Sequence, residues 1–125
     1  MRTFVILGML ILSYIPLRAT DIKTYREWFR ADASDFQRVA RESYIKGIGE
    51  AGMSWANAQL IVLRHEPIYC VPKKLALGWA NYKDILDQQI VEEAKHRTAE
   101  ELDKQEIEAL LLFGLIETFP CEGKK

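Results

Sequence analysis

Histidine and cysteine are scarce in this sequence, with two of each among 125 residues. The four residues His65, Cys70, His96 and Cys121 are scattered along the chain, whereas protein zinc sites use ligands grouped at short spacing. We therefore expect neither a metal site nor a bound cofactor.

An excess of positive charge is also missing. Lys and Arg number 17 against 18 Asp and Glu, which gives a formal net charge of -1, and the two signs are mixed along the chain. A protein that binds a phosphate backbone normally shows a basic face or stripe, so we do not expect nucleic-acid binding. Internal repeats and low-complexity segments are absent as well. The length then favours one domain with one modest core.

The apolar run near the N-terminus is too short for an ordinary membrane span. It covers residues 4–15, about a dozen residues, against roughly 20 needed to cross a bilayer. Arg2 precedes it, and Ala19 offers a small residue at a cleavage point. This segment resembles a secretory signal peptide, so we expect export, removal of residues 1–19 and a single domain of residues 20–125 that is not attached to the membrane. An uncleaved membrane anchor is the alternative.

Both cysteines lie in the expected mature chain, and an exported protein matures under oxidising conditions. Two cysteines allow one intramolecular pairing, so we expect a Cys70–Cys121 disulfide that holds the end of the chain to its middle. Closing a loop of about 50 residues stabilises the fold by about 4 kcal/mol in the chain-entropy model. Intermolecular pairing and free thiols are the alternatives. Oxidation would also remove Cys70 as a nucleophile.

Helix start signals recur along the chain. In each, a hydroxyl residue precedes Glu or Gln by three positions, which is typical of a capping box: Thr24 with Glu27, Ser34 with Gln37, and Thr98 with Glu101. We expect a first short helix over residues 25–30. The second helix follows the next signal, with an apolar stripe predicted to face the core: Phe36, Ala40, Tyr44, Ile48 and Ala51.

The stretch "GIGEAG" at residues 47–52 has the glycine spacing of a dinucleotide-binding loop. Such a loop lies between a strand and a helix, and here an amphipathic helical pattern precedes it. We therefore interpret the glycines as close helix packing or as the weakened end of the second helix.

The rest of the chain also predicts helices. Repeating apolar residues favour a third helix over residues 76–95, and a last helix over residues 99–117 should bury its second half. Residues 60–63 are apolar without a decisive period, so a buried strand, a helical turn and a packed loop all stay open. The predicted fold class is all-α, a small bundle of about four helices closed by one disulfide.

The carboxylates between residues 92 and 108 are interleaved with Lys95, Arg97 and Lys104. Catalytic carboxylate pairs need an enclosing cleft that separates their pKa values, so we interpret this run as a solvated helix surface. With no credible nucleophile, base or metal ligand set, we expect a protein that is not an enzyme.

Large aromatic side chains serve either core packing or protein interfaces. We expect Trp79 and Tyr44 in the core. Trp55 stands beside the glycine-rich stretch, and its neighbours do not decide between the two roles.

Three stretches carry a family resemblance. "YIKGIGEA" at residues 44–51, "YCVP" with "LALGW" at residues 69–79, and "ALLLFGLIETFPC" at residues 109–121 occur in this order. In order and rough spacing they resemble the Rap/Tai family of type VI secretion immunity proteins. The resemblance covers most of the mature chain. Relatives often carry a cysteine where this chain has Arg41, so a second disulfide is not expected.

The resemblance implies a periplasmic protein that binds and neutralises a toxin, typically a peptidoglycan amidase, and that often forms a homodimer. A periplasmic structural or chaperone-like interaction protein without a cognate toxin is the alternative, and a small hydrolase is a distant third. For the partner-binding surface we select Arg64, His65 and Glu66, where polar residues interrupt an apolar run before the expected disulfide. Their alternative interpretation is an ordinary surface turn.

Overall fold

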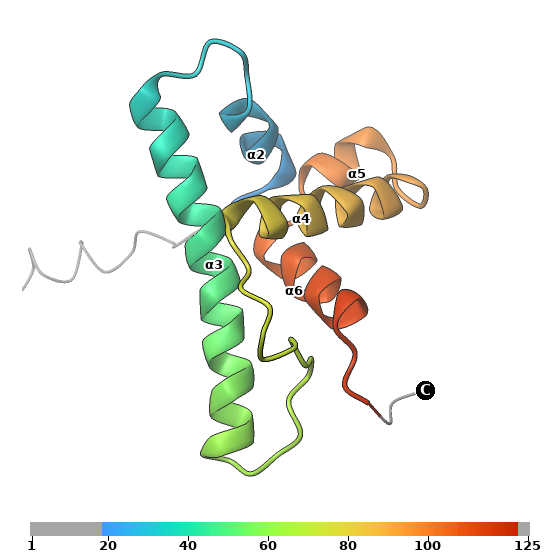
Figure 1. Cartoon of the computed structure of the whole chain (residues 1–125). Coiled ribbons are helices and arrows are strands. Elements are labelled where there is room, and N and C mark those ends of the chain that lie inside the picture. The colour runs from blue at the N-terminus through green and yellow to red at the C-terminus, as the bar shows by residue number, and fades with distance from the viewer. Residues whose placement is uncertain (1–18, 123–125) are drawn as a thin grey trace, which may run out of the picture.

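The computed structural model describes residues 19–122, and within that range the chain is helical without a named strand. The helices are α2 (Ile22–Trp28), α3 (Asp35–Ile61), α4 (Trp79–Ala94), α5 (Ala99–Asp103) and α6 (Ile107–Thr118) (Figure 1). This confirms the all-α fold class. The predicted signal peptide lies outside the described residues except for its last residue, Ala19. No helix within residues 19–122 combines the length and apolarity needed to span a membrane.

Two of the three predicted capping boxes are present. Ser34 begins α3 and Thr98 begins α5, each with the reciprocal side-chain and backbone hydrogen bonds of that motif. The prediction at Thr24 is wrong, because Asp21 caps α2 and accepts a hydrogen bond from the Thr24 backbone N–H at 2.8 Å. An aspartate is a stronger N-cap than a threonine, and it starts this helix three residues earlier than expected.

The second helix is longer and rotated relative to the prediction. α3 has 27 residues, and its buried positions are Ile45, Gly49 and Ala56. The expected stripe was wrong for most of its length, since Phe36 is 82% exposed and Tyr44 is 36% exposed, while Ile48 does pack against the core. Gly49 lies within the helix rather than at its end, which confirms the interpretation of close helix packing.

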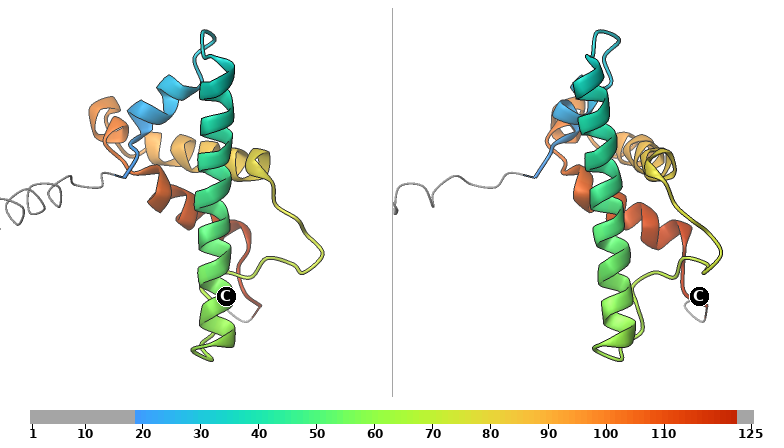
Figure 2. Two further views of the ribbon diagram at one scale, coloured as in Figure 1. Left: turned by 90° about the vertical axis from the view of Figure 1, so that its left-hand side faces the viewer. Right: turned by 60° about the vertical axis from the view of Figure 1, so that its left-hand side comes forward.

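The core forms where α4 and α6 pack together beneath the middle of α3 (Figure 2). α4 begins at Trp79 rather than residue 76 because Gly78 is its N-cap. Trp79 is half-buried, and the fully buried aromatic of this helix is Tyr82. The core side chains that these two helices contribute are Tyr82, Ile85, Leu86, Ile90, Ile107, Leu110, Leu111 and Leu115.

The predicted last helix is divided into α5 and α6. Residues 104–106 leave the helical path and pair with the segment before α2: the Ile22 N–H donates to the Gln105 carbonyl at 3.0 Å, and the Ile107 N–H donates to the Thr20 carbonyl at 2.9 Å. This pairing, with an isolated bridge between Asp21 and Glu106, accounts for one helix more than the predicted four within the described chain.

Candidate functional site

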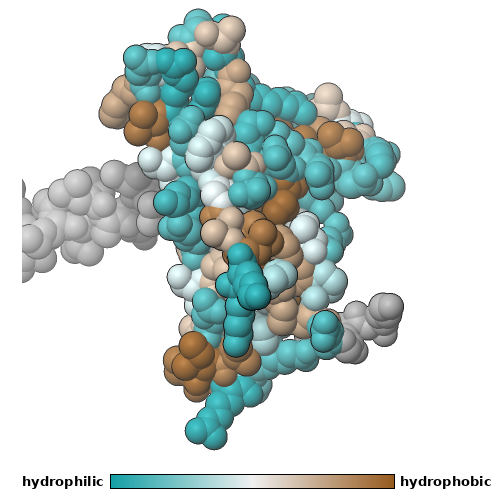
Figure 3. All heavy atoms as spheres, viewed as in Figure 1, coloured by the Kyte–Doolittle hydropathy of each residue, from teal (hydrophilic) through white to brown (hydrophobic). Residues whose placement is uncertain are grey.

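The C-terminal end of α3 carries the most concentrated exposed apolar surface of the described chain. Four consecutive aliphatic side chains are each more than half exposed there: Leu60 (56%), Ile61 (74%), Val62 (73%) and Leu63 (52%). We call these residues the apolar tip. Figure 3 shows apolar atoms gathered at the lower end of the molecule, where α3 ends. Aliphatic side chains this exposed and contiguous mark a site for a protein partner more often than an ordinary surface.

The backbone at the apolar tip is ordered by hydrogen bonds. The N–H groups of Val62 and Leu63 donate to the Ala58 carbonyl at 2.9 and 3.3 Å. The His65 N–H donates to the Gln59 carbonyl at 3.0 Å. Arg64 has φ 53°, in the left-handed region that glycine usually occupies. The tip is therefore a defined turn and not an unravelled helix end. This resolves the open question about residues 60–63: the first two end α3, and the next two form the turn.

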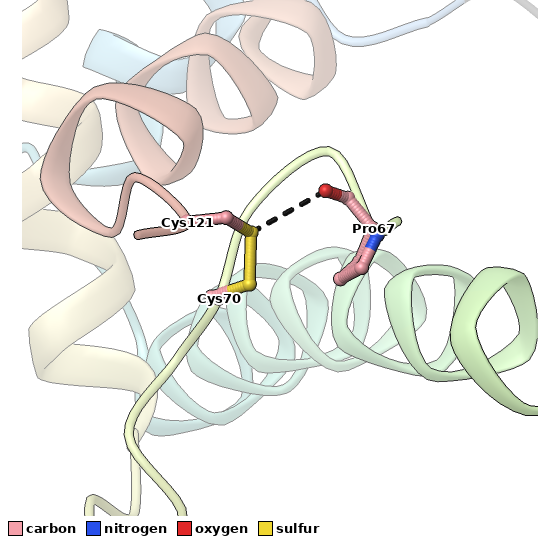
Figure 4. The surroundings of a disulfide bond; sticks show 3 residues. All are labelled: Pro67, Cys70 and Cys121. Carbon is pink, nitrogen blue, oxygen red and sulfur yellow. Dashed lines mark hydrogen bonds between the residues drawn. A yellow bond between two sulfur atoms is a disulfide. The ribbon is translucent and has the colours of Figure 1, made fainter. Parts of the chain in front are cut away.

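The segment that returns from the tip, residues 64–70, which we call the return segment, is fastened to the end of α6. The Cys70 N–H donates to the Phe119 carbonyl at 2.8 Å, and Cys70 is disulfide-bonded to Cys121 with 4.9 Å between their Cα atoms. Cys121 is buried, and its Sγ lies 3.4 Å from the Pro67 carbonyl oxygen (Figure 4). The predicted disulfide is confirmed, and Cys70 is not available as a nucleophile.

Tyr69 holds the same return segment against α3. Its side chain is 1% exposed and packs where α3 has no side chain, since a Cβ at Gly52 would lie 2.9 Å from the tyrosine hydroxyl. Burial raises the pKa of Tyr69 to about 12. A pocket of about 250 Å³ beside the tip is lined by residues that include Leu60, Tyr69 and Lys73. The return segment that follows the tip is therefore held in two ways, by the packing of Tyr69 against α3 and by the Cys70–Cys121 disulfide.

The predicted partner-binding residues Arg64, His65 and Glu66 directly follow the apolar tip, and all of them are exposed. The structure brings them together with the tip at one end of the molecule. Sequence reasoning did not identify residues 60–63 as surface, because an apolar run without a period looks the same whether it is buried or exposed. Four aliphatics immediately before a polar turn were the available signal.

A second exposed apolar surface lies at the opposite end of α3. Phe36 and Val39 are 82% and 64% exposed, and a pocket of about 280 Å³ between α2 and α3 lies between Trp28 and Tyr44. We call this the N-terminal apolar face. Arg41 donates a hydrogen bond to the Trp28 carbonyl at 2.6 Å and joins α2 to α3.

Among the described residues, no group of three or more His, Cys, Asp or Glu side chains is arranged to hold a metal ion. The carboxylates of the charged run form surface ion pairs, such as Glu93 with Arg97 at 2.5 Å and Glu100 with Lys104 at 2.7 Å. The exposed aliphatic side chains of the apolar tip are the observation that favours a surface for binding a macromolecule.

Comparison with models of protein families, with curated proteins and with solved structures gave no match to this chain.

Proposed function

We propose that this protein is a periplasmic immunity protein that binds and neutralises a type VI secretion toxin, a peptidoglycan amidase. The proposal includes export by residues 1–19 as a signal peptide. The observation that carries it is the apolar tip, with four consecutive aliphatic side chains exposed on a turn that hydrogen bonds and a disulfide hold in place.

Burial of such a surface provides binding free energy without any reactive group. Apolar area contributes about 25 cal/mol per Å² when it leaves water, and a rigid element loses little conformational entropy on binding. The two ends of the return segment supply that rigidity, one through the turn at Arg64 and the other through Cys70. An inhibitor of this kind acts by occupying its target.

The shape of the tip favours a target with an open cleft. An enzyme that cleaves the peptides of peptidoglycan must admit an extended chain, and a narrow helix end with apolar side chains complements such a cleft. Arg64 and His65 stand beside the aliphatics and are suited to polar contacts at the rim of the interface.

Co-expression tests the proposal. Cells that export members of a panel of periplasmic amidase toxins are compared with and without the full-length chain, and lysis is followed by optical density. We expect protection against at least one toxin. Equal lysis with and without the chain across the panel contradicts the proposal and favours the chaperone-like alternative.

A matched pair of variants then tests the surface. Val62→Asp places a charge in the apolar tip, while Val91→Asp makes the same change at a valine of similar exposure, 60% against 73%, on α4. We expect Val62→Asp to abolish protection and Val91→Asp to retain it. Val39→Asp, on the N-terminal apolar face, is the third variant. If only Val39→Asp loses protection, the interface lies at the N-terminal end of α3 and not at the apolar tip.

A further inference from the structure

The chain is hydrogen-bonded into the fold from Thr20 onwards. Thr20 accepts the Ile107 N–H at its carbonyl, and Ile22, two residues later, is fully buried and donates its N–H to Gln105. Ala19, immediately before, is exposed. The boundary between the exposed and the paired chain therefore coincides with the cleavage point expected after Ala19.

A carboxylate lies directly at this boundary. The Thr20 backbone N–H donates to Glu108 Oε1 at 3.0 Å, although the two residues are 88 positions apart. The Thr20 hydroxyl and the Tyr44 hydroxyl are 3.0 Å apart, and the Tyr44 hydroxyl also donates to Glu108 Oε1. Three elements thus meet around one carboxylate, that of Glu108 in the first turn of α6: the start of the chain through Thr20, α3 through Tyr44, and α6 itself.

The second oxygen of the same carboxylate has no hydrogen-bond partner within residues 19–122. Glu108 Oε2 is buried and makes no hydrogen bond to any residue that the structure describes. A buried carboxylate oxygen without a donor costs about 1–3 kcal/mol or more. In the intact chain the Thr20 nitrogen is an amide, with one proton that Oε1 already accepts.

We propose that this site receives the α-ammonium group of Thr20 after leader cleavage. Water adds across the Ala19–Thr20 peptide bond with the help of a leader peptidase. The C–N bond breaks, Ala19 leaves with a carboxylate, and Thr20 gains an amine that is protonated at neutral pH. The ammonium carries three protons in place of one, so it donates to both oxygens of Glu108 and neutralises the carboxylate charge.

The consequence is that processing completes the fold. Before cleavage the site holds an amide and a carboxylate oxygen that no described residue pairs with, and after cleavage it holds an ion pair that ties the mature N-terminus to α6. The inference rests on the export part of the proposed function and is independent of toxin binding.

The test displaces the charge by one residue. The full-length chain and a variant with one serine inserted between Ala19 and Thr20 are exported and purified, and mass spectrometry reads each N-terminus. Both are also made with Glu108→Gln, which keeps the size of the side chain and removes its charge. Urea unfolding gives the folding equilibrium constant of all four proteins.

We expect the mature chain to begin at Thr20 and the insertion to lower the equilibrium constant about tenfold, the range of a hydrogen bond to a charged group. In the Glu108→Gln background the insertion should change it by less than about twofold. A mature chain that begins at another residue overturns the inference, as does an equal loss in both backgrounds.

A second measurement is independent of whether Glu108→Gln folds. Titration of the Thr20 amine by NMR should give a pKa at least one unit above the ordinary 7.7–8.0 of an α-amino group. An ordinary value overturns the inference. Neither result depends on protection against a toxin, so failure here is distinguishable from failure of the proposed function.

Discussion

A Cβ atom at Gly49 would lie 2.5 Å from Cδ1 of the Tyr82 ring, so α3 and α4 cross at a position where one helix has no side chain. Tyr82 is 1% exposed and fills the space that Gly49 leaves. α3 runs about three turns beyond this contact to the apolar tip, so the crossing with α4 sets the direction in which the tip projects.

Two glycine substitutions separate this contact from helix propensity. Gly49→Ala forces a methyl group into the Tyr82 ring, and we expect it to destabilise the fold by about 1–3 kcal/mol. Gly47→Ala is the control, since a Cβ there meets nothing within 4 Å, and removing a helical glycine should stabilise by about 0.5–1 kcal/mol. Urea unfolding measures both. A stabilised Gly49→Ala would show that the helices do not cross this closely.

Loss of the disulfide should destabilise the protein substantially. The Cys70–Cys121 bond spans 51 residues, for which the chain-entropy model gives about 4 kcal/mol. We expect the double substitution to serine and reduction by dithiothreitol to lower the unfolding midpoint by similar amounts. Reduction of the serine double variant is the control and should have no effect. If reduction leaves the unfolding midpoint of the wild type unchanged, the disulfide does not stabilise the fold.

The sequence predicted the elements that depend on local chemistry. The helix caps at Ser34 and Thr98 depend only on residues three positions apart, so the sequence shows them directly. Two cysteines allow one intramolecular pairing, so the disulfide was predictable as well. The prediction at Thr24 failed because Asp21, a better cap, stands three residues before it. The prediction of one long last helix was wrong because residues 104–106 pair with the start of the chain. A local sequence pattern cannot show a contact between residues so far apart.

The backbone at Arg64 offers a test of the turn at the tip. Its φ of 53° is unfavourable for a residue with a Cβ, by roughly 1–2 kcal/mol. We expect Arg64→Gly to stabilise the fold by about 0.5–1 kcal/mol, because the entropy of glycine in the unfolded state offsets part of the gain. Arg64→Ala keeps the Cβ and should not stabilise. Equal effects of the two variants on stability would contradict the left-handed turn.

Buried tyrosines predict a loss of stability at alkaline pH. Burial raises the pKa of Tyr69 to about 12, and burial followed by the hydrogen bond to Asp87 raises the pKa of Tyr25. Unfolded tyrosines ionise near pH 10, so the stabilisation is complete below that pH and is lost as the pH rises towards 12.

Urea unfolding at pH 9 and pH 11, with short incubation, measures this effect. We expect up to about 1.4 kcal/mol of loss for each tyrosine over one pH unit above 10. Tyr69→Phe is the control, because the Tyr69 hydroxyl is buried without a partner among the described residues. It should reduce the loss, and an identical pH dependence would show that Tyr69 ionises as it does in the unfolded chain.

The candidate site was predictable only in part. Local polarity selects Arg64, His65 and Glu66, which do adjoin the tip, while the apolar run at residues 60–63 does not by itself distinguish exposure from burial. Their exposure follows from the length of α3 beyond Gly49 and from the path of the return segment to Cys70. Both are tertiary features. The stripe from Phe36 was misassigned for the same reason, since the partner helices bury the face that carries Ile45 instead.

A binding affinity tests most directly the proposal that the apolar tip contacts a toxin. An amidase toxin from the co-expression panel that the wild-type protein neutralises, made inactive at its catalytic nucleophile, is titrated calorimetrically with the mature protein. Truncation of a buried interface anchor costs 2 kcal/mol or more, so Val62→Asp should raise Kd by about 30-fold or more, while Val91→Asp should change it by less than about twofold. An unchanged Kd for Val62→Asp would contradict the claim.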